Sequence, residues 1–266
     1  METNRKYEFT GETYQQGDHL LHRIIALRDF GNVKKGDLGG FIEKESNLAN
    51  NGNCWIYNDA VVRGDAMVYG DAKVYGNAKV YGNAKVYGSA KVCGEAMVYG
   101  NAEVYGNAKV CGNAEVYGNA EVYGNAVVRG DATVCSNAEV CDNAEVCGEA
   151  MIYGDAEVYG NAVVRGDAKV YGDAEVYGNA VVRGDATVCG DAEVEKESDY
   201  IVFKNWWSSG RYFTWTRSND MWSVGCFYGT GEELIKKAYK DSEEKGREYE
   251  RIVKYVELIK LEIDKQ

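Results

Sequence analysis

The sequence predicts an all-β solenoid flanked by two small end domains. One six-residue phrase, Gly-Asn/Asp-Ala-x-Val-Tyr, is repeated without a break from Ala60 to Val194, with an alanine at every sixth position from Ala60 to Ala192. The chain of 266 residues contains 32 Gly and 21 Tyr but no Pro. This composition is typical of a short phrase copied many times, and a fixed period indicates units that bury their apolar faces against their neighbours.

Residues 1–35 precede the repeat and predict a small β cap. Tyr7-Glu-Phe-Thr and the apolar run from Leu20 are separated by a turn around Gln16-Gly-Asp, which favours a hairpin. An open β edge invites aggregation, so we expect this unit to cover the first turn of the solenoid. The solenoid itself is predicted over residues 36–195, where degenerate first turns place Ile42, Leu48 and Cys54 in line with Ala60, and Leu38 and Ile56 in line with Val62.

Within the repeat, Ala-x-Val-Tyr reads as a short strand and Gly-Asn/Asp as the corner, because Gly and Asn tolerate a positive φ. The phrase resembles the hexapeptide repeat of left-handed β-helix proteins, a superfamily that contains many acyltransferases and the γ-type carbonic anhydrases. The resemblance implies a left-handed, parallel triangular prism with three hexads per turn.

Stacking three hexads per turn gathers like residues on the outer faces of this prism. One outer face, the acidic face, combines tyrosines with a column of carboxylates: Glu103, Glu121, Glu139, Glu157 and Glu175. This column is either solvated or neutralised by the basic groups of a partner. A second outer face, the Val–Arg face, places exposed valines beside guanidinium groups, a common composition for an interface core. We predict a protein contact there, with a solvated face as the alternative, through Val127, Arg129, Val163, Arg165, Val181 and Arg183.

Residues 196–266 predict an α+β domain of three short strands and two helices. The strands are expected at Tyr200-Ile-Val-Phe, after Arg211 and after Met221, and a capping box at Thr230-Gly-Glu-Glu begins the first helix. Lys245-Gly246 is expected to separate the two helices. Aromatic and basic residues of this domain form either its core or a surface that stacks on a nucleotide or a partner: Trp206, Trp207, Arg211, Tyr212, Trp215 and Arg217.

The charge balance restricts the partners of the chain. Forty-two acidic and 30 basic residues give a formal net charge of −12, which argues against direct binding of nucleic acid or of an anionic membrane. No apolar run approaches the roughly 20 residues that span a bilayer, and the first residues lack the apolar core of a signal peptide. We therefore expect a cytoplasmic protein.

Six of the eight cysteines occupy the tyrosine position of the repeat. We interpret them as members of repeat columns rather than as a disulfide framework, in keeping with a reducing compartment. Cys93 and Cys111 lie one predicted turn apart, close enough to pair under oxidation, but we expect them to be free.

Enzymes of the superfamily depend on histidine. The resemblance implies a general-base His on a loop in the acyltransferases and three zinc-binding His in the γ-type carbonic anhydrases. This chain has two histidines, His19 and His22, both in the N-terminal cap, and no loop leaves the repeat. We therefore expect no catalytic residue, no metal and no cofactor, and predict that the protein is not an enzyme.

The flanking segments Ile25-Ala-Leu-Arg-Asp-Phe-Gly and Gly225-Cys-Phe-Tyr-Gly-Thr-Gly resemble hexapeptide-repeat proteins carried by phages and prophages of Gram-positive bacteria. Together with the outer faces, this resemblance predicts a homo-oligomer, a dimer or trimer, that binds and blocks or organises a protein of the bacterial host, such as a defence protein. The alternatives are an acyltransferase relative with a site between subunits, a nucleotide-binding sponge, and an acidic mimic of nucleic acid.

Overall fold

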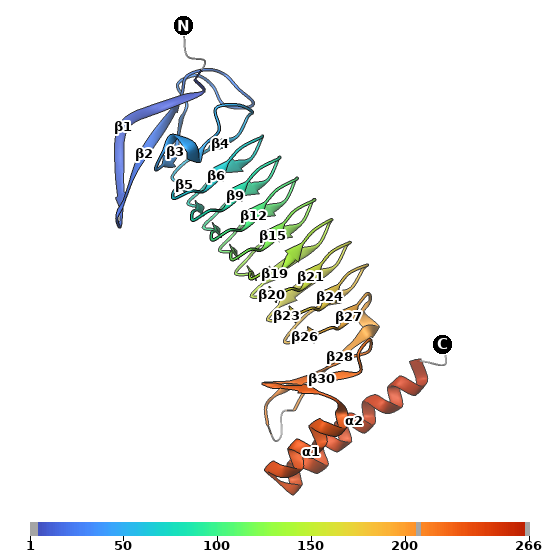
Figure 1. The fold of residues 1–266 in the computed structure, drawn as a ribbon. Coiled ribbons are helices and arrows are strands. Elements are labelled where there is room, and N and C mark those ends of the chain that lie inside the picture. The colour runs from blue at the N-terminus through green and yellow to red at the C-terminus, as the bar shows by residue number, and fades with distance from the viewer. Residues whose placement is uncertain (1–4, 206–208, 264–266) are drawn as a thin grey trace.

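The computed structural model describes residues 5–205 and 209–263. It contains a long triangular β-helix with an N-terminal hairpin at one end and a domain of two helices and a small sheet at the other (Figure 1). The predicted left-handed parallel β-helix with three hexads per turn is confirmed. No helix among the described residues is both long enough and apolar enough to span a membrane.

The N-terminal hairpin continues into the first sheet of the prism. Strands β1 (Tyr7–Gln16) and β2 (His19–Ala26) are antiparallel, and β2 also pairs with β3 (Leu38–Ile42). Strand β3 then pairs in parallel with β5 (Val61–Val62), the first regular strand of this sheet. The hairpin therefore covers the edge that the first coil would otherwise expose.

Three parallel sheets form the walls of the prism. The first sheet continues from β5 through β8 (Lys79–Val80), β11 (Met97–Val98), β14 (Glu115–Val116), β17 (Thr133–Val134), β20 (Met151–Gly154), β23 (Lys169–Gly172) and β26 (Thr187–Gly190). The second sheet carries the Val–Arg face on β4 (Trp55–Ile56), β7 (Lys73–Val74), β10 (Lys91–Val92), β13 (Lys109–Val110), β16 (Val127–Val128), β19 (Glu145–Gly148), β22 (Val163–Gly166) and β25 (Val181–Val182). The third sheet carries the acidic face on β6 (Met67–Val68), β9 (Lys85–Val86), β12 (Glu103–Val104), β15 (Glu121–Val122), β18 (Glu139–Val140), β21 (Glu157–Val158), β24 (Glu175–Val176) and β27 (Glu193–Val194).

The prism has one continuous core of alanine and valine. The Ala and Val of each hexad between Ala72 and Val194 are fully buried, apart from Ile152, which fills one Val position and is also fully buried. Burying a valine side chain contributes about 1.5–3 kcal/mol. The corners need glycine: Gly82 has a φ of +71°, and a Cβ there would lie 3.0 Å from the backbone N of Gly100 in the next coil. Because successive corners stack closely, the corner position has little room for a side chain.

The register of the first coil differs from the prediction. Ile42 lies opposite Val62 and Leu48 opposite Val68, whereas Ile56 lies opposite Val74, so the early offset is 20 residues instead of 18. Ile42 and Leu48 thus fill valine positions, not alanine positions. The added residues are accommodated by the 3-10 turn η1 (Glu45–Asn47) and a turn at Gly52. Leu38, expected to point inward, is 55% exposed.

The C-terminal domain begins with the 3-10 turn η2 (Glu197–Asp199) and contains four antiparallel strands instead of three. They are β28 (Tyr200–Lys204), β29 (Tyr212–Thr216), β30 (Met221–Val224) and β31 (Phe227–Gly229). The last predicted strand is split because Gly225 adopts a φ of +59°, which turns the chain back on itself.

Two helices pack against this small sheet: α1 (Gly231–Asp241) and α2 (Glu243–Ile263). The predicted capping box is present, since the Thr230 hydroxyl accepts from the N–H of Glu233. The helices are separated at Ser242, not at Gly246. Gly246 lies inside α2 because the Tyr239 ring packs on it, and a Cβ there would be 2.2 Å from that ring.

Side chains after the repeat form hydrogen bonds with the backbone of the last strand in each prism sheet. The N–H of Thr187 donates to Oγ1 of Thr214 (2.9 Å), and the N–H of Glu193 donates to Oγ of Ser218 (2.7 Å). On the second sheet, the Tyr200 hydroxyl donates to the carbonyl of Val181 (2.8 Å). The C-terminal domain therefore blocks the strand edges at this end of the prism.

One pair of cysteines is bonded, whereas the sequence predicts that both are free. Cys93 and Cys111, which directly follow the adjacent strands β10 and β13 of the Val–Arg sheet, form a disulfide with a Cα–Cα distance of 4.6 Å. The parallel register places both side chains in the same outward column, which brings the two sulfur atoms together. The other six cysteines are free.

Candidate functional site

The acidic face is a ladder of stacked tyrosines with carboxylates beside them. The rings of Tyr87 and Tyr105 stack with centroids 4.9 Å apart and planes 3° from parallel. Each hydroxyl donates to a carboxylate in the following coil: Tyr87 to Glu103 at 2.8 Å and Tyr105 to Glu121 at 2.8 Å. The same bond joins Tyr123 to Glu139, Tyr159 to Glu175 and Tyr177 to Glu193. Most of the predicted partner-binding carboxylates thus already have a partner within the chain.

The Val–Arg face lies on the second sheet of the prism. The side chains of Val127, Val163 and Val181 are half-buried, and the arginines beside them are exposed. Arg129 hydrogen-bonds to Glu145 (Nε to Oε1, 2.9 Å), and Arg183 forms an ion pair with Glu197 at 3.0 Å. Arg165 forms no ion pair with a described residue and remains available to a partner.

The aromatic and basic residues of the C-terminal domain do not form one surface. Trp215 is 1% exposed and packs in the core of the domain, which excludes it from a ligand surface. Arg211 and Tyr212 line a shallow hollow against the first prism sheet, together with Lys169 and Tyr171. Trp206 and Trp207 lie outside the described residues, and Arg217 lies on a separate hollow.

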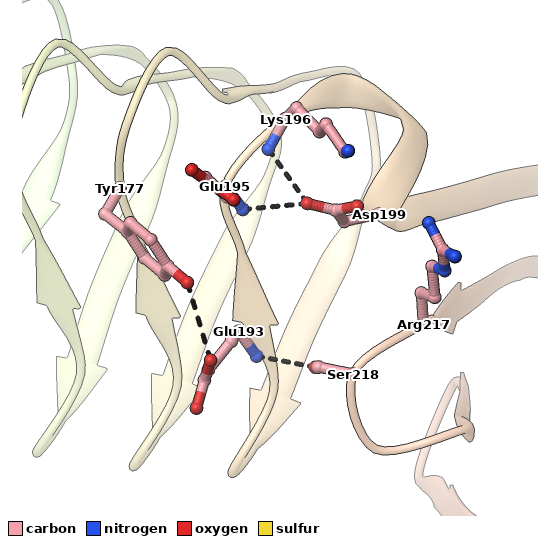
Figure 2. Close-up of a pocket in the computed structure, with 7 residues that line it drawn as sticks. All are labelled: Tyr177, Glu193, Glu195, Lys196, Asp199, Arg217 and Ser218. Carbon is pink, nitrogen blue, oxygen red and sulfur yellow. Dashed lines mark hydrogen bonds between the residues drawn. The ribbon is translucent and has the colours of Figure 1, made fainter. Parts of the chain in front are cut away.

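That second hollow lies where the last coil meets the C-terminal domain (Figure 2). Two backbone N–H groups, of Glu195 and Lys196, donate to Oδ2 of the buried Asp199 at 3.0 Å each. These hydrogen bonds hold the turn η2 against the coil. The hollow contains no histidine or cysteine, so it offers carboxylates but no neutral base, and its lining residues are Tyr177, Glu193, Glu195, Lys196, Asp199, Arg217 and Ser218.

A histidine–carboxylate pair lies at the opposite end of the molecule. Nδ1 of His19, at the start of β2, is 2.9 Å from Oε1 of Glu43, which follows β3. The other oxygen of Glu43 accepts the N–H of Gly64 at 2.6 Å. The pKa of Glu43 is lowered, first by the hydrogen bond with His19 and then by that of Gly64. Glu43 is thus held as a carboxylate with both oxygens occupied.

This pair leaves one nitrogen of His19 available. A carboxylate only accepts hydrogen bonds, so the proton of the neutral ring lies on Nδ1 and the lone pair on Nε2. Nε2 makes no hydrogen bond to a described residue, and the His19 side chain is 37% exposed. A histidine oriented by a fixed carboxylate is the arrangement of the base in catalytic triads.

His22 has no such partner. Its ring stacks on Phe9, with centroids 4.7 Å apart and planes 19° from parallel. The two histidines therefore do not converge on a metal, and the described residues contain no group of three or more His, Cys, Asp or Glu side chains that could hold one.

The pairing of His19 with Glu43 does not follow from the sequence. Glu43 directly follows Ile42, which lies opposite His22 in the antiparallel pair of β2 and β3. The hairpin was predicted, but its pairing with residues 38–42 was not, and only that pairing brings the two side chains together.

Comparison with known proteins bears on which class of reaction this site could support. No protein-family model matches the chain. A segment is 41% identical over 66 residues, 22% of this chain, to a protein of Escherichia coli (strain K12) named "Uncharacterized acetyltransferase YdcK". The match spans only 20% of that protein. The similarity overturns the prediction that the chain is not an enzyme, and with the observed fold it supports a hexapeptide-repeat β-helix protein.

Proposed function

We propose that the protein is an acyltransferase that moves an acyl group, such as acetyl, from a coenzyme A thioester to a hydroxyl or amino group. The observation that carries this proposal is the His19–Glu43 pair, an accessible imidazole whose tautomer is fixed by a carboxylate. The similarity to a protein named an acetyltransferase supports the class of reaction.

In this reaction His19 is the general base. Nε2 takes the proton from the acceptor while the acceptor oxygen or nitrogen attacks the thioester carbonyl. The carbon–sulfur bond then breaks, and coenzyme A leaves as a thiol after receiving the proton. Glu43 is a positioning residue: it fixes the ring and stabilises the imidazolium that forms, as the carboxylate of a catalytic triad does.

The test is thiol release from acetyl-coenzyme A in the presence of a panel of amino sugars. Proton transfer by a positioned base contributes about 10²- to 10⁴-fold. We therefore expect His19→Gln to lower kcat by that factor and Glu43→Gln to lower kcat by less, with KM for acetyl-coenzyme A unchanged in both. His22→Gln is the matched control on the same strand and should retain full activity.

Two results would contradict the proposal. One is activity in His19→Gln equal to that of the unmodified protein. The other is no thiol release with any acceptor together with no retention of coenzyme A in equilibrium dialysis. The predicted setting in phages, the cytoplasmic location and the blocking of a host protein are untested by these comparisons and stay predictions.

A further inference from the structure

The tyrosine ladder of the acidic face is broken in a single coil. In residues 131–148 the tyrosine position of all three hexads is a cysteine: Cys135, Cys141 and Cys147. On the acidic face, Cys141 stands between Tyr123 in the coil before and Tyr159 in the coil after. The chain therefore replaces one ring of the ladder with a side chain that ends at its sulfur atom.

The rings on both sides of this break keep the ladder geometry. Tyr123 stacks on Tyr105 with centroids 4.9 Å apart, and Tyr159 stacks on Tyr177 at 5.2 Å. Tyr123 and Tyr159 are two strands apart, so their planes are separated by roughly 9.6 Å at the usual spacing of about 4.8 Å per strand. A planar group between them would lie about 4.8 Å from each ring, within the roughly 6 Å over which a cation is attracted to an aromatic face.

The break also leaves one carboxylate without its tyrosine. From Tyr87 onward, the other hydroxyls of the column reach the glutamate of the following coil, as in Tyr123 to Glu139 (2.9 Å) and Tyr159 to Glu175 (2.7 Å). By this pattern a tyrosine at position 141 would donate a hydrogen bond to Glu157, but the shorter side chain of cysteine does not reach that carboxylate. Glu157 forms no hydrogen bond or ion pair with any described residue. Burial and the charges of Glu139 and Glu175 raise its pKa.

We propose that the break at Cys141 is a binding site for a guanidinium group, held between Tyr123 and Tyr159 and neutralised by Glu157. A guanidinium is planar and weakly hydrated, so it stacks on aromatic rings, and its N–H groups match a carboxylate in a fork. An ammonium group is compact and strongly hydrated and cannot fill the place of a ring. The site is independent of the proposed chemistry at His19.

The thiol of Cys141 does not oppose this assignment. The Tyr123 hydroxyl interacts with Cys141 and with Glu139, and these contacts together with burial raise the pKa of Tyr123. Tyr123 therefore stays neutral and keeps its ring in the ladder. Cys141 itself remains partly exposed, and its pKa is raised mainly by burial, so the thiol adds no negative charge to the site.

A second break in the prism provides an internal control. On the first sheet, Cys135 replaces a ring between Tyr117 and Tyr153. In the preceding strand, Glu115 already accepts the hydroxyl of Tyr99 at 3.0 Å. The outward neighbour in the strand before Cys135 itself is Thr133, and the position that corresponds to Glu157, in the following strand, is Met151. No carboxylate occupies these two positions, and Cys135 is only 9% exposed. This break has the same kind of aromatic neighbours but no carboxylate left without its tyrosine, so it should not bind a cation.

The experiment is calorimetric titration of the full chain with methylguanidinium and with methylammonium at equal ionic strength. We expect methylguanidinium to bind at least tenfold more tightly. Cys141→Tyr restores the repeat and should abolish this binding, whereas Cys135→Tyr should leave it unchanged. Glu157→Gln should weaken it about tenfold. Because Cys141→Tyr follows the consensus of the repeat, loss of binding in that variant is not explained by unfolding.

Two further titrations identify the source of the guanidinium. A capped Gly-Arg-Gly peptide that binds more tightly than free arginine assigns the site to a protein side chain, and the reverse order assigns it to a small molecule. Equal affinity for methylguanidinium and methylammonium would overturn the proposal. Unchanged binding in Cys141→Tyr would overturn it as well. Loss of acyl transfer in His19→Gln would not affect the binding of methylguanidinium, so the two proposals are tested separately.

Discussion

At the scale of single residues, the tyrosine hydroxyls explain how the prism tolerates a column of glutamates. Neighbouring carboxylates about 4.8 Å apart repel by roughly 0.9 kcal/mol in water. A hydrogen bond to a charged acceptor contributes about 1.5–3 kcal/mol, and Tyr105 provides one to Glu121 at 2.8 Å. The stacked hydroxyls therefore more than offset the repulsion wherever the ladder is intact.

Glu157 is the position where this compensation is missing, and it predicts a stabilising substitution. Because the pKa of Glu157 is raised in the folded protein, its ionisation at neutral pH disfavours folding, and stability is recovered as the pH falls through the folded pKa. We expect Glu157→Gln to increase the free energy of unfolding at neutral pH by less than about 1 kcal/mol, given its exposure. Thermal unfolding should show this gain disappear in acid.

Glu121→Gln is the matched control for this prediction, since it removes the same charge from the same column. It also weakens the hydrogen bond that Tyr105 donates. We expect a lower Tm for this variant at neutral pH. A lower Tm for Glu157→Gln as well would show that the carboxylate at 157 is stabilised by contacts that the ladder does not supply.

At the scale of elements, the Cys93–Cys111 disulfide joins strands β10 and β13 across one coil. Closing a loop of this length stabilises a protein by about 3 kcal/mol through the unfolded state. We expect Cys93→Ser to lower the free energy of unfolding by about that amount under oxidising conditions. A reducing agent should lower the free energy of unfolding of the unmodified protein to that of the variant. It should leave the free energy of unfolding of the variant unchanged.

Cys147→Ser provides the comparison, because Cys147 lies in the same outward column and is free. It should respond to the reducing agent as the unmodified protein does. If the reducing agent left the stability of the unmodified protein unaltered, the bond would not form in solution, and the expectation of free thiols drawn from the repeat pattern would stand.

The elements show which features of the fold can be predicted from sequence. The six-residue period gives strand, corner and core, because Ala and Val repeat with the geometry of the coil. The split between β30 and β31 was missed because a single Gly225 adopts a positive φ inside an apolar run. Gly246 was read as a helix break, but it permits α1 and α2 to approach closely. Such glycines are ambiguous until their tertiary neighbours are known.

The candidate site was harder to predict than the fold. His19 and Glu43 are 24 residues apart, and neither belongs to a motif. Their contact depends on a non-local pairing of β2 with β3, together with a first coil that is longer than the later ones. The lack of histidine in the repeat argues against chemistry there, whereas the general base that we propose, His19, lies in the cap.

At the scale of the whole molecule, we propose that two or three copies associate through the Val–Arg face. Exposed arginines beside Val163 and Val181 resemble the composition of an interface core. Val163→Glu should convert an oligomer to a monomer, as measured by light scattering after size-exclusion chromatography. Thr133→Glu, on the first sheet and away from both ends of the prism, is the control. A monomeric unmodified protein at all concentrations tested would contradict the proposal.

The contacts that close each wall at the C-terminal end fix the domain to the last coil, so the number of hexads sets both its distance and its rotation relative to the N-terminal hairpin. Thr214, Ser218 and Tyr200 each match a strand on a particular wall. Inserting or deleting a whole coil shifts the C-terminal domain along the axis and preserves all three matches. Inserting one hexad also preserves these contacts, because the last coil moves with the domain, but it rotates the domain by a third of a turn relative to the N-terminal hairpin and moves each downstream column of side chains to a different face. Variation in the length of such a chain is therefore expected in steps of three hexads.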